Sequence, residues 1–119
     1  MKKLLLVVML SGCAGPQYTQ IDYSRKPPEG WPTLRQQITY GSEEQVKRWC
    51  ARAPGAAMAG DKLKGCALAY FEWNLCTIFL TSKDPEQLKH EQAHCAGYNH
   101  VGEPNLSQQA YDAWKAKQK

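Results

Sequence analysis

The spacing of apolar residues predicts a strand and then a helix in the first half of the chain. Residues 35–40, RQQITY, alternate enough between polar and apolar positions for a β-strand. The next residues predict a helix that begins after Ser42, a good N-cap, with Gln45 three positions later as in a capping box. The apolar residues of this helix recur on one face: Val46, Trp49, Cys50 and Ala53.

Residues 66–81, CALAYFEWNLCTIFLT, predict a β-hairpin. Two runs of β-prone residues flank Trp73-Asn74, and we take that pair as the turn. The facing pairs would then be Phe71 with Cys76, Ala69 with Ile78, and Ala67 with Leu80. This face is apolar throughout and should pack on a helix, but a slip of one residue would exchange the two faces.

Helix-start and helix-stop residues predict two further helices. Asp84 is an N-cap with Pro85 at the first helical position, and Gly97 suits the left-handed residue that follows a helix end. A last helix is expected from about Ser107, with a lysine-rich end that suits the helix dipole. Together these elements predict an α+β fold, in which a small antiparallel sheet (the hairpin plus the strand near 35–40) packs against two or three helices.

The length of 119 residues allows a single domain, which we expect to span residues 35–119. Residues 14–34 contain four prolines and two glycines without an apolar period, which predicts a tether. Residues 1–12 predict a signal peptide, because two lysines precede an apolar run, Leu4–Leu10, that is too short to cross a bilayer as a permanent helix.

The end of the signal peptide resembles a bacterial lipobox. LSGC, residues 10–13, has a branched apolar residue, two small residues and a cysteine. The resemblance implies cleavage before Cys13, diacylglycerol on its thiol and a lipid-anchored tether over 13–34. The residue after Cys13 is Ala14 and not aspartate. In sorting of the enteric type this implies the periplasmic face of the outer membrane in the bacterial cell envelope. The alternative is an ordinary secretory signal in which the cysteine is coincidental.

Charge and cysteine content narrow the class of protein. The net charge is +4, or +2 without Lys2 and Lys3, and no basic cluster is present, so we expect no nucleic-acid partner. We also expect a monomer. Beyond Cys13 an even number of cysteines remains in an exported small domain, which predicts two disulfides. These cysteines are Cys50, Cys66, Cys76 and Cys95. Three pairings are open, and a thiolate metal site is disfavoured because no CxxC pair occurs.

All three histidines of the chain lie in one stretch, KHEQAHCAGYNH, residues 89–100. His90 and His94 are four apart, so on a helix they share a face and can bind one zinc ion. Glu91, beside the first ligand, can accept a proton from zinc-bound water. Gly97 should end the helix and let His100 return to the same ion. Three neutral histidines would leave a fourth, catalytic position open on one Zn²⁺.

This stretch matches HExxHxxGxxH at every defined position, and it resembles the motif of the metzincin zinc peptidases. With the cysteine-containing hairpin ahead of it, the chain also resembles a group of small bacterial proteins with a HExxHCxGYxH helix. The resemblance implies a minimal zincin-like fold with three histidine ligands, His90, His94 and His100, and Glu91 as the catalytic base. It further implies that residues 66–72 form an edge strand that holds a peptide or protein substrate by β-addition.

Some assignments around the motif stay open. No methionine follows His100, although metzincins place a methionine turn there. Glu103 competes with His100 as third ligand, because other zincins use a downstream carboxylate. Tyr98 and Tyr111 are candidates for stabilising an oxyanion, with packing as the alternative role for each.

The helix also suggests the disulfide pairing. Cys95 follows His94, so it points about 100° away from the metal face and should meet Cys76 on the apolar hairpin face. That leaves Cys50 for Cys66. A Cys76–Cys95 bridge would clamp the zinc helix to the sheet.

Two functions follow from these patterns. The first is a membrane-anchored zinc metallopeptidase of the cell envelope, in which Glu91 activates zinc-bound water for hydrolysis of a peptide bond. The alternative is a non-catalytic envelope lipoprotein whose zinc site is structural or binds a partner.

Overall fold

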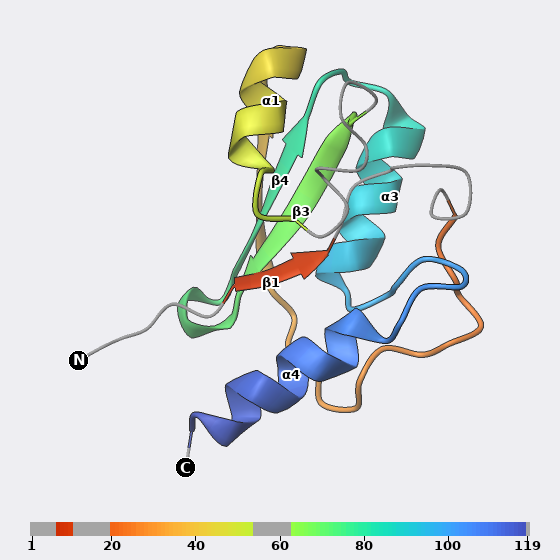
Figure 1. Ribbon diagram of the computed structural model, residues 1–119, viewed down its shortest axis with the longest axis vertical. Helices are drawn as coiled ribbons and strands as arrows, with labels where there is room; N and C mark the ends of the chain where they lie inside the picture. The colour runs from red at the N-terminus through yellow and green to blue at the C-terminus, as the bar shows by residue number, and fades with distance from the viewer. Residues whose placement is uncertain (1–6, 11–19, 54–62, 119) are drawn as a thin grey trace.

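The computed structural model describes residues 7–10, 20–53 and 63–118 of the chain (Figure 1). The described elements follow in the order β1 (Val7–Leu10), β2 (Arg35–Tyr40), α1 (Glu43–Trp49), β3 (Gly65–Tyr70), the 3-10 helix η3 (Phe71–Trp73), β4 (Leu75–Leu80), α3 (Pro85–Cys95) and α4 (Leu106–Ala116). Among these helices none is long and apolar enough to cross a membrane.

The strands form one sheet in the order β1-β3-β4-β2. This confirms the α+β class, but the sheet is mixed rather than antiparallel, since β2 pairs parallel with β4. The connection through α1 explains the difference. It returns the chain so that β3 runs opposite to β2, and the tight β3–β4 connection then turns β4 back into the parallel direction between them.

The connection between β3 and β4 is longer than the two-residue turn expected at Trp73-Asn74. A turn of η3 and then Asn74, which is left-handed at φ 52°, join the two strands. The predicted pairing is therefore wrong by two residues: Ala69 faces Cys76 and Ala67 faces Ile78. Because this shift is even, the same side chains still share a face, and the predicted apolar face is retained.

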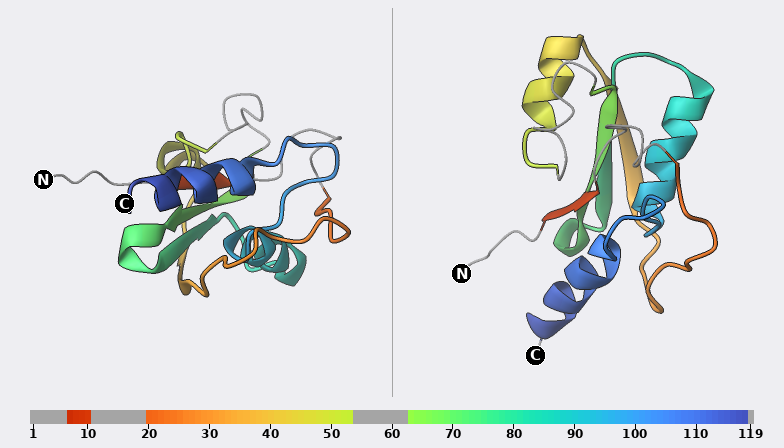
Figure 2. Two further views of the ribbon diagram at one scale, coloured as in Figure 1. Left: turned by 90° about the horizontal axis from the view of Figure 1, so that it is seen from below. Right: turned by 45° about the vertical axis from the view of Figure 1, so that its right-hand side comes forward.

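Helices cover both faces of the sheet, with α1 on one side and α3 on the other (Figure 2). The α3 side holds the larger group of buried apolar residues: Leu34, Ala67, Ala69, Phe71, Cys76, Ile78, Leu80 and Cys95. The α1 side holds a second group: Val46, Cys50, Ala53, Leu63, Cys66 and Leu68. The strand β3 contributes to both groups, which makes it the centre of the fold.

Local signals at the helix starts are confirmed. Ser42 caps α1 with the reciprocal capping box that includes Gln45. Asp84 caps α3, and its carboxylate accepts a hydrogen bond from the Glu86 amide at 3.0 Å. These short-range contacts set where each helix begins, because they satisfy amides that have no partner inside the helix.

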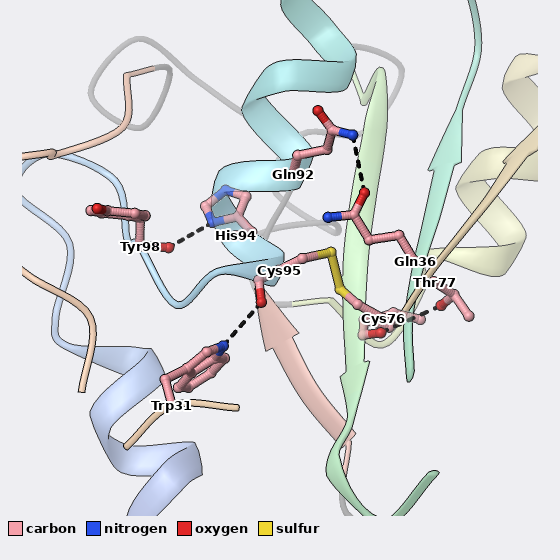
Figure 3. Close-up of a disulfide and its surroundings, with 9 residues drawn as sticks. Trp31, Gln36, Cys76, Thr77, Gln92, His94, Cys95 and Tyr98 are labelled. Carbon is pink, nitrogen blue, oxygen red and sulfur yellow. Dashed lines mark hydrogen bonds between the residues drawn. A yellow bond between two sulfur atoms is a disulfide. The ribbon is translucent and has the colours of Figure 1, made fainter. Parts of the chain in front are cut away.

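Two disulfides join helices to the sheet with the predicted pairing. Cys50–Cys66 connects the end of α1 to β3, and Cys76–Cys95 connects β4 to the last residue of α3. Figure 3 shows that Cys95 points toward β4, whereas the His94 ring beside it points elsewhere. The second bridge therefore clamps α3 to the sheet without occupying the histidine face.

Residues 20–34, here called the N-terminal strap, belong to the stretch that the sequence assigned to a tether. They run past the C-terminal end of α3 in Figures 1 and 2. The Trp31 indole donates to the Cys95 carbonyl at 2.9 Å, and the Asp22 amide donates to the Asn99 carbonyl at 2.9 Å. The strap is thus packed on the domain, while Cys13 and the rest of the expected tether lie outside the described residues.

Candidate metal centre

The helix α3 places His90 and His94 one turn apart on the same face. Pro85 and the Asp84 cap fix where the helix begins, and the two rings lie with their centroids 4.9 Å apart, edge to face. His94 is fully buried, whereas His90 is partly exposed. Two imidazoles are therefore held on a rigid element with few side-chain movements left to them.

Gly97 ends α3 as the sequence predicts. Its φ of +99° lies in the region that L residues rarely adopt. A Cβ atom at this position would lie 2.9 Å from Pro27 Cβ and 2.9 Å from Trp31 Cδ2. The glycine thus serves the turn and also the close approach of the strap.

The strap holds the backbone on both sides of His100. Ile21 and His100 form an isolated antiparallel β-bridge. The Val101 amide donates to the Gln20 carbonyl at 2.8 Å, next to the Asp22–Asn99 bond. The third histidine is therefore positioned by a segment almost eighty residues earlier in the chain.

The Nε2 atoms of the three histidines converge. His100 Nε2 lies 3.0 Å from His90 Nε2 and 3.0 Å from His94 Nε2. Two nitrogens about 2.0–2.1 Å from a tetrahedral zinc ion would lie about 3.3 Å apart, close to these separations. The ligand atoms of His90, His94 and His100 all lie within 4.8 Å of one another, so the group could hold a metal ion.

The opposite ring nitrogens also have partners. His94 Nδ1 lies 2.9 Å from the Tyr98 carbonyl oxygen, which can only accept, so the ring carries its hydrogen on Nδ1 (Figure 3). His100 Nδ1 lies 3.3 Å from Glu103 Oε1. These contacts leave the Nε2 lone pairs of both rings for a metal. Of the two candidates for third ligand, His100 joins the group, and Glu103 contacts the Nδ1 side of the His100 ring.

Glu91 is a fully buried acid whose two carboxylate oxygens have no hydrogen-bond partner among the described residues. It lies against the start of β3, where a Cβ on Gly65 would be 3.6 Å from Glu91 Oε2. Burial raises the pKa of Glu91 well above its usual value. An acid in this state needs a polar ligand, water or ion to satisfy it.

Burial has the opposite effect on the histidines. It lowers the pKa of His90 to about 4, with a further contribution from the neighbouring His100. The pKa of His94 is also held well below its usual value, first by burial and then by His100 and His90. Both rings are therefore neutral at pH 7, which is the form that binds a metal.

The two tyrosines proposed as oxyanion stabilisers have different surroundings. Tyr111 packs in an aromatic group with Trp31 and Phe71, at centroid distances of 6.2 and 6.5 Å. Tyr98 packs its ring on Tyr23 at 5.1 Å, and its carbonyl meets His94. Both rings are thus packed against other aromatic rings, and an oxyanion role for either hydroxyl stays a prediction.

Sequence reasoning missed one residue that supports the third-ligand loop. The side-chain amide of Asn99 donates from Nδ2 to Asn105 Oδ1 at 2.9 Å and to Ser107 Oγ at 3.0 Å. Its side-chain oxygen Oδ1 accepts from the backbone amide of Ser107 at 3.1 Å. Asn105 caps α4, so Asn99 ties the loop to the start of that helix. The only sequence signal was a polar residue next to His100 that the zinc motif leaves undefined.

His90 opens toward a cavity of about 190 Å³ on the outer side of α3. The cavity is lined by Ile21, Tyr23, Glu86, Lys89 and His90. The strap thus forms one wall of the approach to the histidines, and α3 forms the other.

No family model, curated protein or solved structure matches this chain.

Proposed function

We propose that this chain is a zinc-dependent metallopeptidase, held by a lipid anchor at the bacterial cell envelope. The convergence of His90, His94 and His100, with the buried and unpartnered Glu91 next to His90 in the helix sequence, is the observation that carries the proposal. Three neutral histidines suit zinc, and they leave one position of a tetrahedral ion for water or substrate. The expected lipobox at Cys13 supports the anchor.

A bound zinc ion would supply a Lewis acid and lower the pKa of coordinated water toward about 7. The histidines would hold the ion through Nε2, and the Nδ1 contacts of His94 and His100 would keep those two rings from turning. Glu91 accepts the proton from the attacking water and passes it to the leaving amine. A positive ion nearby would oppose the burial effect on the Glu91 pKa and favour the ionised base.

The edge of β3 is the surface that suits an extended peptide. In the structure β1 pairs antiparallel with it, from Val7 opposite Tyr70 to Leu10 opposite Ala67. Because β1 lies within the expected signal peptide, cleavage before Cys13 would remove it. In the structure β3 lies between β1 and β4, so residues 66–72 would become an edge strand that could take a peptide substrate only once β1 is gone.

A Glu91→Gln variant tests this function. The purified zinc-loaded protein is assayed against a library of short peptides, and the variant should lose about 10²–10⁴-fold in rate, the usual contribution of a general base. Glu44→Gln, which changes an exposed acid in the first turn of α1 on the other face of the sheet, is the control and should keep the activity. Hydrolysis that survives Glu91→Gln undiminished rejects the mechanism.

A second function is favoured by the burial of the site. His94, His100 and Glu91 are fully buried, and such enclosure also suits a structural or partner-binding zinc site in a non-catalytic lipoprotein. A fourth protein ligand in a zinc-bound structure would support this reading. So would a domain whose thermal stability falls sharply under a chelator while no peptide in the library is cut.

A further inference from the structure

Glu103 is an acid with two hydrogen-bonding contacts to a single residue. Its side chain is only 8 % exposed. Oε1 accepts a hydrogen bond from the His100 amide at 2.9 Å and lies 3.3 Å from Nδ1 of the same ring. One carboxylate oxygen thus meets both the backbone and the side chain of the third histidine.

The contact lies on the nitrogen that does not face the other rings. His100 Nε2 is the atom 3.0 Å from His90 and His94, so Nδ1 and Glu103 lie on the opposite side of the imidazole. A carboxylate there accepts the Nδ1 hydrogen and selects the tautomer whose lone pair is on Nε2. It also makes the ring a stronger ligand.

We propose that Glu103 is a positioning residue that fixes the orientation and tautomer of His100 for metal binding. The proposal rests on the metal centre of the proposed function, but not on peptide hydrolysis. It replaces the alternative in which Glu103 is itself the third ligand.

The backbone around Glu103 supports this role. Its amide donates to the His100 carbonyl at 3.2 Å, closing a tight turn in which Gly102 has φ +79°. The Arg25 guanidinium of the strap donates to the Glu103 carbonyl at 3.3 Å. The backbone of Glu103 is therefore held on both sides, which limits where its carboxylate can lie relative to the ring.

The test measures zinc affinity of the full-length protein by competition with a chromophoric chelator. Glu103→Ala should bind zinc about 10–100-fold more weakly, the usual effect of losing such an outer partner. Glu103→Gln should stay close to the unsubstituted protein, because its amide oxygen can accept from the same two groups. Glu72→Ala, which removes an exposed acid on η3, is the control and should leave the affinity unchanged.

A second readout follows the His100 ring itself. ¹⁵N spectra of the zinc-loaded protein should show hydrogen on Nδ1 and metal on Nε2, both in the unsubstituted chain and in Glu103→Gln. In Glu103→Ala the His100 signals should shift or split while those of His94, which has its own carbonyl partner, stay in place. Loss of a merely structural contact would not select one ring in this way.

The possible results separate the two proposals. If the unsubstituted protein binds no zinc, the metal centre and the proposed function fail together. If it binds zinc and Glu103→Ala binds equally well, the positioning role is overturned while the metal centre stands. A Glu103→Gln variant as weak as Glu103→Ala would overturn the role in fixing the tautomer, because the amide oxygen can accept from the same two groups. Should Glu103→Ala not fold, Glu103→Asp, whose shorter chain cannot reach both groups, should weaken binding in the same direction.

Discussion

At the scale of residues, Glu91 and the histidines respond to burial in opposite ways. An acid without hydrogen-bond partners inside a small domain costs stability, about 1–3 kcal/mol for an unsatisfied polar group. The buried carboxyl group of Glu91 makes no hydrogen bond among the described residues that would offset this cost. The arrangement makes physical sense when a proton, water or ion meets the carboxylate, as the proposed chemistry requires.

The zinc-free protein should lose stability as the pH rises above neutrality because of Glu91. Its pKa is raised in the folded state, so the native protein keeps a proton that the unfolded chain releases above about 4.5. The stability from this group is therefore complete below that pH and is lost as the pH rises toward the raised pKa. Above about pH 6.5 the free energy of unfolding should fall as the pH rises, by at most about 1.4 kcal/mol per pH unit, until Glu91 ionises in the folded state. Denaturant unfolding of Glu91→Gln over the same range should remove this slope, and an unchanged slope would contradict it.

Below about pH 6.5 the histidines add the opposite slope. The pKa of His90 is lowered to about 4 and that of His94 is also held well below its usual value, so the unfolded chain binds protons that the native protein does not. Stability contributed by these neutral rings is present above about 6.5 and is lost as the pH falls. Apo protein should thus be most stable near the point where the two effects cross, in the region of about pH 6.5.

At the scale of elements, the loop after α3 decides where the third ligand lies. Gly97 and Gly102 both have positive φ, but only Gly97 sits against other side chains. A methyl group on Gly102 would meet nothing within 4 Å. The two positions therefore separate backbone strain from contact with the strap.

Gly97→Ala should be more destabilising than Gly102→Ala by about 1–3 kcal/mol, the usual cost of overpacking. Both substitutions carry the backbone cost of a positive φ, so their difference reports the clash with Pro27 and Trp31. Denaturant unfolding of both variants measures it. Equal losses would mean that the strap does not press on the end of α3.

The two disulfides should also separate stability from metal binding. Each closes a similar span, 16 and 19 residues, so replacing either pair with alanine should cost about 2–5 kcal/mol. Only Cys76–Cys95 holds the helix that carries two histidines, and only its loss should weaken zinc affinity. Unfolding and zinc titration on both variants check this, and equal effects on affinity would remove the clamp role.

The sequence predicted features that depend on near neighbours. The caps at Ser42 and Asp84, the end of α3 at Gly97 and the alignment of His90 with His94 all follow from contacts within a few residues. The hairpin register was wrong by two, because η3 and a left-handed Asn74 lengthen the connection and no favoured turn pair marks it. Phe71 in this connection is buried in the core, and the local sequence pattern does not reveal such packing.

At the scale of the whole molecule, the N-terminal strap packs against the loop that carries His100. The loop between α3 and α4, which carries His100, is bounded by these two helices and by residues 20–25 of the strap. Asn99 makes the contact with α4. The hydrogen bonds between the strap and this loop mostly join backbone groups that are far apart in the sequence. A proline-rich stretch without an apolar period therefore looked like a tether, although its backbone pairs with the motif.

Shortening the chain in two steps tests whether the strap holds the metal centre. A protein that begins at Gln20 keeps the bridge between Ile21 and His100, whereas one that begins at Lys26 loses it together with the two flanking backbone hydrogen bonds. Both lack β1, so the comparison cancels any effect of that strand. The shorter protein should unfold more easily by about 1–3 kcal/mol, since each backbone hydrogen bond contributes about 0.5–1.5 kcal/mol. It should also bind zinc more weakly, because the His100 backbone is no longer held. Equal zinc affinity in the two proteins would show that the loop positions His100 without the strap. The strap would then line the cavity at His90 without contributing to zinc binding.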